Sequence, residues 1–237
     1  MSKRIELLNW LLSEKSEVLI RDGRHRVSFF ASVLADMYEQ KAVKLTDETC
    51  RIEGLEELER FNLGILDAHT LNIFSVIIRI VESMSDSIRV FTVVGSYSDL
   101  KIAEGWSDVD AFMVVKDRSI RNREEFEKLR SECISINREF KKLCPLQHHG
   151  VIAVAESDLK SYSSHSMPVN VLRRSKSIFF TESLKFCMKG SDESGVIKSL
   201  EERVRYMQKA LESGIYEHHP WRGKGLAIDG SSFDSGM

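Results

Sequence analysis

Two short apolar runs flank a polar segment and constrain the fold more than any other part of the sequence. The first run, Val90–Val94, stops at Gly95-Ser96, and the second, Ala111–Val115, follows directly after Ser107-Asp108-Val109-Asp110. Runs of this length that are rich in Val and Phe and bounded by Gly, Ser or Asp are typical of buried strands. We therefore predict two neighbouring core strands with a polar connection between them.

The polar segment contains two carboxylates, Asp108 and Asp110. Strand side chains alternate between faces, so these two are expected to project from one face. A divalent cation relieves their mutual repulsion, and Mg²⁺ is usually held by one or two carboxylates together with substrate phosphates. Gly95 lets backbone N–H groups approach a phosphate, and a helix starting at Ser96 would direct its positive end to the same anion. The segment therefore predicts phosphoryl or nucleotidyl transfer.

The combined pattern of strand, Gly95-Ser96, Ser107-Asp108-Val109-Asp110 and strand resembles the signature of the DNA polymerase beta-like nucleotidyltransferase superfamily. The resemblance covers residues 88–155, and the combined motif is much rarer than either half alone. The alternative is a βαβ unit with two surface aspartates at a strand end.

The resemblance implies a metal-dependent transfer of a nucleoside monophosphate from a nucleoside triphosphate, with ATP expected first, to a hydroxyl acceptor, with release of pyrophosphate. It implies that Asp108 and Asp110 are catalytic residues that bind Mg²⁺ and that Gly95, Ser96 and Ser107 bind the nucleotide. The acceptor is not readable from the sequence.

The connection between the strands contains further candidates. Lys101 is a candidate phosphate partner, although a solvated lysine is the more common case. Tyr97 and Trp106 could stack on a base, but packing is the more frequent role of a tryptophan, and we rank stacking below it.

The third strand, Val151–Ala155, departs from the superfamily's pattern because it has no internal carboxylate. Three interpretations follow. In the first, His149 of the pair His148-His149 takes the third position as a catalytic residue, and its neutral imidazole nitrogen binds the metal or orients the attacking hydroxyl. Alternatively, Glu156 reaches the site, or the site binds a nucleotide without efficient chemistry. In a fourth interpretation the two histidines have no role in the site, and they only cap the strand and fill space in the fold.

Composition limits the classes of protein. The chain has 237 residues, 42% of them hydrophobic, and a net charge of −2, which makes nucleic acid an unexpected partner without excluding it. The four cysteines form no C-x-x-C pair and are expected to be free thiols in a reducing compartment. The N-terminus is too charged for a signal peptide, and we find no apolar stretch long enough to span a membrane. We therefore expect a cytoplasmic protein without a membrane partner.

The pattern as a whole predicts an α+β fold in which a small mixed sheet is flanked by N-terminal helices and a C-terminal helical segment. We predict an N-terminal helical segment over residues 1–86, a nucleotidyltransferase core over 87–158, and a mostly helical segment over 159–237. The predicted helices cover 3–14, 26–40, 53–60, 66–84, 120–143 and 193–213, and strands cover 87–94, 111–115, 151–155 and 177–180. The last residues, 226–237, suggest either a chain that continues into further helices or a flexible tail.

Two functions are therefore carried forward from the sequence. The favoured one is an active nucleotidyltransferase. The other is a catalytically degenerate protein of the same fold that binds a nucleotide or a partner protein as a regulatory module. What stands opposite Asp108 and Asp110 in the folded chain should help to discriminate between them.

Overall fold

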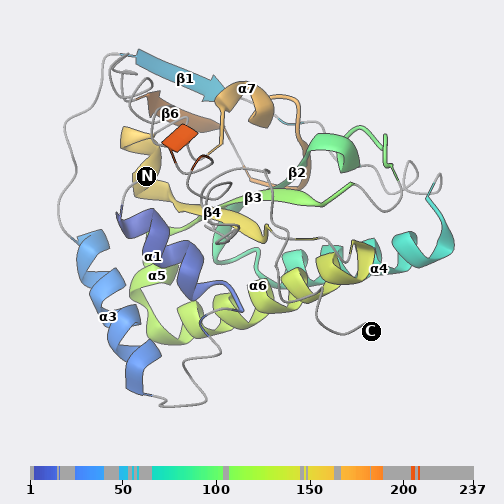
Figure 1. Cartoon of the computed structure of the whole chain (residues 1–237). Coiled ribbons are helices and arrows are strands. Elements are labelled where there is room, and N and C mark those ends of the chain that lie inside the picture. The colour runs from blue at the N-terminus through green and yellow to red at the C-terminus, as the bar shows by residue number, and fades with distance from the viewer. Residues whose placement is uncertain are drawn as a thin grey trace. The chain divides into compact units, whose positions relative to one another are not determined.

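The structure of the chain, a computed structural model, describes most of its N-terminal three quarters (Figure 1). The described residues are 3–14, 16, 25–39, 48–52, 55, 58, 66–103, 107–144, 147, 149–162, 167–181, 183–188, 204, 205 and 208. The chain divides into two compact units, Met1–Lys189 and Gly190–Met237. The fold described here is that of the first unit.

A four-stranded mixed sheet forms the centre of this unit. Its strands are β2 (Ile88–Val94), β3 (Asp110–Val115), β4 (Val151–Ala155) and β5 (Lys176–Phe180), in the order β4-β3-β2-β5. β2 is antiparallel to β3 and β5, whereas β3 and β4 are parallel. A separate antiparallel pair joins β1 (Glu48–Ile52) to β6 (Leu184–Met188). The predicted α+β class with a small mixed sheet is confirmed.

Helices account for most of the remaining described chain. They are α1 (Lys3–Leu11), α3 (His25–Glu39), α4 (Ala68–Ser83), α5 (Asp117–Arg121), α6 (Arg123–Leu143) and α7 (Val169–Leu172), with 3-10 segments η2 (Gly95–Tyr97) and η3 (Glu156–Ser161). Among these described helices, none combines the length and the apolarity needed to cross a bilayer.

The apolar stretch before β2 forms helix α4 rather than a strand. Asp67 caps its N-terminus, because the Asp67 side chain accepts a hydrogen bond from the Thr70 N–H at 2.9 Å. The buried residues Phe74, Ile77 and Val81 follow helical spacing and face the sheet side of the unit. The helical periodicity of this stretch therefore outweighs its many β-branched residues.

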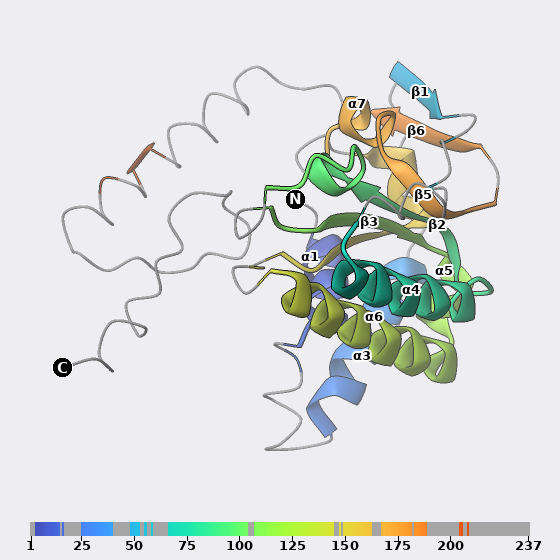
Figure 2. The same ribbon diagram turned by 90° about the vertical axis from the view of Figure 1, so that its right-hand side faces the viewer.

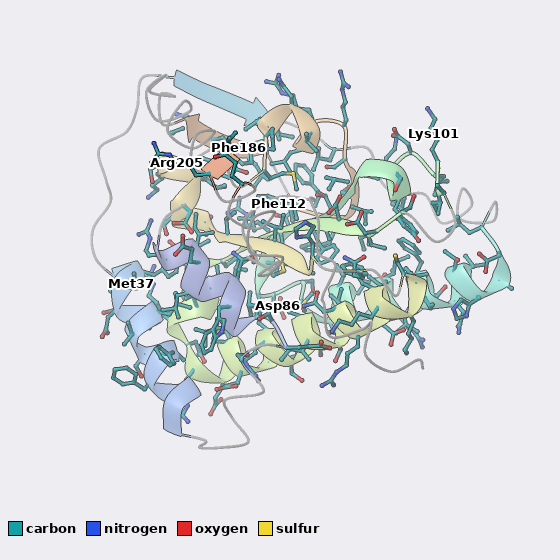
Figure 3. The ribbon with its side chains drawn as sticks, viewed as in Figure 1. Met37, Asp86, Lys101, Phe112, Phe186 and Arg205 are labelled. Carbon is teal, nitrogen blue, oxygen red and sulfur yellow. The ribbon has the colours of Figure 1, made fainter. Side chains whose placement is uncertain are left out.

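Two hydrophobic cores lie on the two faces of the sheet. Figure 2 shows the layers that enclose them, with α4 and α6 on one side of β2 and β3 and with α7 and β6 on the other. On the helix side, α4 and α6 lie side by side against Phe91, Val93 and Met113. On the other side, α7, η3 and β6 cover the second core. Phe112 of β3 and Phe186 of β6, both labelled in Figure 3, belong to this second core. Alternate residues of each strand thus serve different cores.

Side chains satisfy the outward backbone groups of β4, which is an edge strand. The Val151 N–H donates to Asn137 Oδ1 at 3.1 Å. Asn9 of α1 forms a pair of bonds with Ala153, accepting from its N–H at 2.7 Å and donating to its carbonyl at 2.6 Å. The Ala155 N–H donates to Asp158 at 3.0 Å. Helices and η3 therefore complete this edge in place of another strand.

The structure differs from the sequence prediction in two places. β1 and β6 were not predicted, and among the described strands each pairs with the other alone. The helix predicted over 53–60 is absent at Leu55 and Leu58, the two described residues of that stretch, and the Leu58 N–H donates to the Ser177 carbonyl of β5 at 2.8 Å. Most of the helix predicted over 193–213, and all of residues 218–237, lie outside the described residues.

Candidate functional site

The antiparallel pairing of β2 and β3 brings the Gly95 turn to the Asp110 carboxylate. Val94 at the end of β2 pairs with Asp110 at the start of β3, so Gly95 follows directly beside Asp110. Gly95 has a φ of 72°, and a Cβ atom added to it would lie 3.6 Å from Asp110 Oδ2. The left-handed backbone favours glycine here, and the bare Cα leaves the backbone close to the carboxylate.

Asp110 is the first residue of β3, and Asp108 precedes it by two residues in the segment that leads into the strand. Val109 and Ala111 are fully buried in the helix-side core, whereas Phe112 belongs to the second core. Asp110, the first residue of β3, therefore lies on the side of the second core, and the same alternation continued before the strand would bring Asp108 to that side. Both residues are half-buried, and Asp108 Oδ2 is shielded from solvent. The carboxylate pair thus lies at the sheet end where β2 stops.

The Gly95-Ser96 turn is a single 3-10 turn and not the start of an α-helix. The Ser98 hydroxyl donates to the Gly95 carbonyl at 2.7 Å, and the Lys101 N–H donates to the Ser96 carbonyl at 2.9 Å. These bonds fold the segment back on itself. Any phosphate binding here would therefore depend on the turn's backbone N–H groups and on the Ser96 side chain, not on a long helix dipole.

The same loop positions Ser107 and Lys101. The Ser107 hydroxyl oxygen accepts a hydrogen bond from the Ala103 N–H at 2.8 Å, which closes the loop before β3. Lys101 is exposed on this loop (Figure 3). Trp106 lies outside the described residues. Ser107 therefore has a defined structural contact, and its role toward a nucleotide stays a prediction, as does that of Lys101.

Tyr97 packs into the helix-side core instead of facing a ligand. Its side chain is 3% exposed, and its ring lies 5.6 Å from the ring of Phe74 at an interplanar angle of 30°. Burial raises the pKa of Tyr97, and the charges of Cys144, Asp67 and Asp108 act in the same direction. Tyr97 therefore has a packing role in the fold.

Gln147 fixes the backbone between the two aspartates. Its Oε1 accepts from the Val109 N–H at 2.8 Å, and its Nε2 donates to the Val109 carbonyl at 2.9 Å and to the His149 carbonyl. The side chain thereby joins the His149 backbone to the Asp108–Asp110 segment. Sequence reasoning missed Gln147 because a single buried amide produces no periodic pattern. The role of the His149 imidazole stays a prediction.

Gly150, the residue just before strand β4, lies beside Asp110. Val151 pairs with Ala111, so Gly150 is the residue next to Asp110. A Cβ atom on Gly150 would lie 2.8 Å from Asn137 Oδ1, which is closer than real Cβ atoms come. A carboxylate side chain at this position would therefore collide with Asn137, and the next residue on that side, Ile152, is apolar.

The acidic residues after β4 are engaged at the other end of the strand. Glu156 forms an ion pair with Arg89 at 2.5 Å. Asp158 accepts from Arg4 at 2.7 Å and from the Tyr38 hydroxyl at 2.7 Å. Both carboxylates lie beyond the C-terminal end of β4, whereas Asp110 lies at the N-terminal end of the parallel strand β3. The structure therefore does not bring Glu156 to the Asp108–Asp110 pair.

The donor set fits a magnesium ion that also binds a substrate. Within the described part of the chain, no group of three or more His, Cys, Asp or Glu side chains could hold a metal ion. Two carboxylates are sufficient for Mg²⁺ when phosphate oxygens and water complete its octahedral shell. Asp108 and Asp110 would hold such an ion only together with a ligand that supplies oxygens.

The chain matches no protein-family model, and no curated protein or solved structure is significantly similar to it.

Proposed function

We propose that the chain binds a nucleoside triphosphate together with Mg²⁺ at the end of β2 and β3. The observation that supports this most directly is the proximity of the Gly95 turn to the Asp110 carboxylate. In such an arrangement the backbone N–H groups of the turn can bind the phosphate oxygens of a metal-bound triphosphate, and the two carboxylates can bind its metal ion. ATP is the nucleotide expected first.

The reaction proposed for this site is nucleotidyl transfer to a hydroxyl acceptor. The acceptor oxygen forms a bond to the α-phosphorus, the bond from that phosphorus to the bridging oxygen breaks, and pyrophosphate leaves. The hydroxyl proton is released to water. Asp108 and Asp110 hold the ion, and Gly95 and Ser96 orient the phosphates for in-line attack. When bound, Mg²⁺ neutralises charge that develops on the phosphate oxygens.

A second candidate function is nucleotide binding without turnover, as a regulatory module. It is favoured by the third strand, where Gly150 and Ile152 stand in place of a third carboxylate. A third ligand usually helps to activate the attacking hydroxyl, so its absence would reduce chemistry more than binding. Both candidates place the nucleotide at the same residues.

The test is isothermal titration of ATP and of GTP, with and without Mg²⁺, on the wild type and on Asp108→Asn and Asp110→Asn. Each substitution removes a carboxylate charge but keeps the side-chain shape, so the fold should survive. We expect magnesium-dependent binding by the wild type and its loss in both variants. Asp99→Asn, which changes an exposed aspartate of the neighbouring loop, is the matched control and should bind like the wild type.

Pyrophosphate release separates the two candidates once binding is established. Nucleotide binding with pyrophosphate release that depends on an added hydroxyl acceptor supports the enzyme. Binding without release across a panel of alcohol, sugar, protein and nucleic-acid acceptors supports the module. Binding that survives Asp110→Asn, or no binding of either nucleotide, contradicts the proposed site.

A further inference from the structure

The amide of Gln147 makes the pairing with Val109 that a neighbouring strand would make. The side chain is 8% exposed, and it both accepts from the Val109 N–H and donates to the Val109 carbonyl, at 2.8 Å and 2.9 Å. A primary amide can present a donor and an acceptor side by side, as a peptide group of an adjacent strand does. Gln147 thus substitutes for strand pairing at one residue.

This substitution occurs where the backbone ladder has ended. The register between β3 and β4 begins at Ala111 and Val151, so Val109 lies before the first paired residue. Gln147 reaches this residue from the segment that leads into β4, and its Nε2 also donates to the His149 carbonyl. One side chain therefore holds together two segments that no longer form a ladder.

Val109 is the residue that separates the two carboxylates. The Cα atoms of Asp108 and Asp110 belong to the two peptide units that flank Val109. The φ and ψ angles of Val109 therefore determine how the two aspartate side chains lie relative to each other. Both backbone groups of Val109 are bonded to Gln147, and its side chain is fully buried. Two hydrogen bonds and a buried side chain therefore hold the Val109 backbone in place.

We infer that Gln147 is the positioning residue of the proposed metal site, setting the relative orientation of Asp108 and Asp110 through the Val109 backbone. This inference rests on the proposed function, because it concerns the same site. Gln147 bonds to the backbone of Val109 and His149 and is not itself a proposed ligand. Substituting residues that orient metal ligands typically lowers metal affinity by about 10–100-fold.

The sheet supplies a matched control at its β4 edge. Asn9 makes the same two-bond pairing with Ala153 that Gln147 makes with Val109, with distances of 2.7 Å and 2.6 Å. Ala153 lies within β4 and adjoins no proposed ligand. Replacing each amide by an apolar side chain of similar shape, as in Gln147→Met and Asn9→Leu, removes equivalent bonds at two places in the sheet.

The experiment titrates the full chain with Mn²⁺, a paramagnetic substitute for Mg²⁺, in the presence of ATP and follows free Mn²⁺ by electron paramagnetic resonance. Thermal unfolding without metal is measured in parallel. We expect both variants to unfold at lower temperatures than the wild type. Only Gln147→Met should weaken Mn²⁺ binding, by about tenfold or more, and only this variant should change the spectrum of bound Mn²⁺.

A conservative variant keeps the inference testable if Gln147→Met does not fold. Gln147→Glu retains the acceptor for the Val109 N–H but loses the donor to the Val109 carbonyl, and it too should weaken Mn²⁺ binding. Wild-type Mn²⁺ affinity in a folded Gln147 variant overturns the inference. An equal loss of affinity in Asn9→Leu also overturns it, since the effect would then follow stability alone.

The wild type and Asp110→Asn distinguish failure of the inference from failure of the proposed function. No Mn²⁺ binding by the wild type, or equal binding by Asp110→Asn, overturns the proposed function and the positioning role with it. Binding that Asp110→Asn abolishes and Gln147→Met leaves unchanged overturns the positioning role alone.

Discussion

At the scale of single residues, two glycines limit what the site can be. Gly95 adopts a left-handed backbone beside Asp110, and Gly150 leaves space that Asn137 fills. The first brings a turn without a side chain to the Asp110 carboxylate, and at the second an added Cβ atom would meet Asn137 at 2.8 Å. Each glycine therefore occupies a position where a side chain would be strained or would collide with a neighbour.

We expect Gly95→Ala to lower the free energy of unfolding by about 1 kcal/mol, because a side chain at a φ of 72° is strained. The added Cβ would meet Asp110 Oδ2 at 3.6 Å, an ordinary contact, so crowding should contribute little. Urea unfolding measures the change. Ser96→Ala, in the same turn, is the control and should differ less from the wild type; an unaltered midpoint for Gly95→Ala would contradict the strain argument.

The buried carboxylate Asp158 should make stability depend on pH. Burial raises its pKa above that of an exposed aspartate, although Tyr38, the Ala155 N–H and Arg4 lower it. A raised pKa means that the folded state binds the proton more tightly than the unfolded state does. This group's contribution to stability is therefore greatest below the pKa of an exposed aspartate, and it is lost as the pH rises through the raised value.

The prediction is that the wild type gains stability relative to Asp158→Asn as the pH falls from neutral toward about pH 4. Denaturant unfolding of both proteins across that range measures the difference between their free energies of unfolding. The exposed Asp86→Asn is the control, for which that difference should change less. A difference that grows in the opposite direction would mean that the ion pair with Arg4 outweighs burial.

At the scale of elements, the sequence predicted those whose signal is local. The apolar runs of β2, β3 and β4 and the helical periodicity of α4 and α6 are each readable within one segment. β1 and β6 were missed because each is stabilised by a partner far away in the chain, and β1 contains few apolar residues.

The sequence could identify Asp108 and Asp110 as a pair but not that Glu156 pairs with Arg89 at the other end of β4. Such facts depend on tertiary packing.

The contact between α6 and β4 provides a test at this scale. Asn137→Ala leaves the buried Val151 N–H without its acceptor, which should cost about 1–3 kcal/mol of the free energy of unfolding. Ser135→Ala, on the exposed side of α6, removes a hydroxyl that bonds only within its own helix and should have a small effect. Equal stability of the two variants, measured by chemical denaturation, would contradict the role assigned to Asn137.

At the scale of the whole molecule, the proposed ligand should stabilise the folded unit. A ligand that binds only the folded state at a hundred times its dissociation constant adds about 2.7 kcal/mol to the free energy of unfolding. We expect ATP with Mg²⁺ to raise the unfolding temperature of the wild type, and EDTA to reverse the rise. Asp110→Asn should show no rise, and Asp99→Asn should behave like the wild type. A rise that persists with EDTA would indicate a site that needs no metal.

The completed edge of β4 has a consequence for how copies of the chain meet. An exposed edge strand is a template onto which another chain can add, and such addition leads to swapping or aggregation. Here Asn137, Asn9 and Asp158 already accept the outward N–H groups of Val151, Ala153 and Ala155. A second copy would have to displace three helix-borne or turn-borne side chains before it could extend the sheet on that side. Substituting these residues should therefore increase self-association as well as reduce stability.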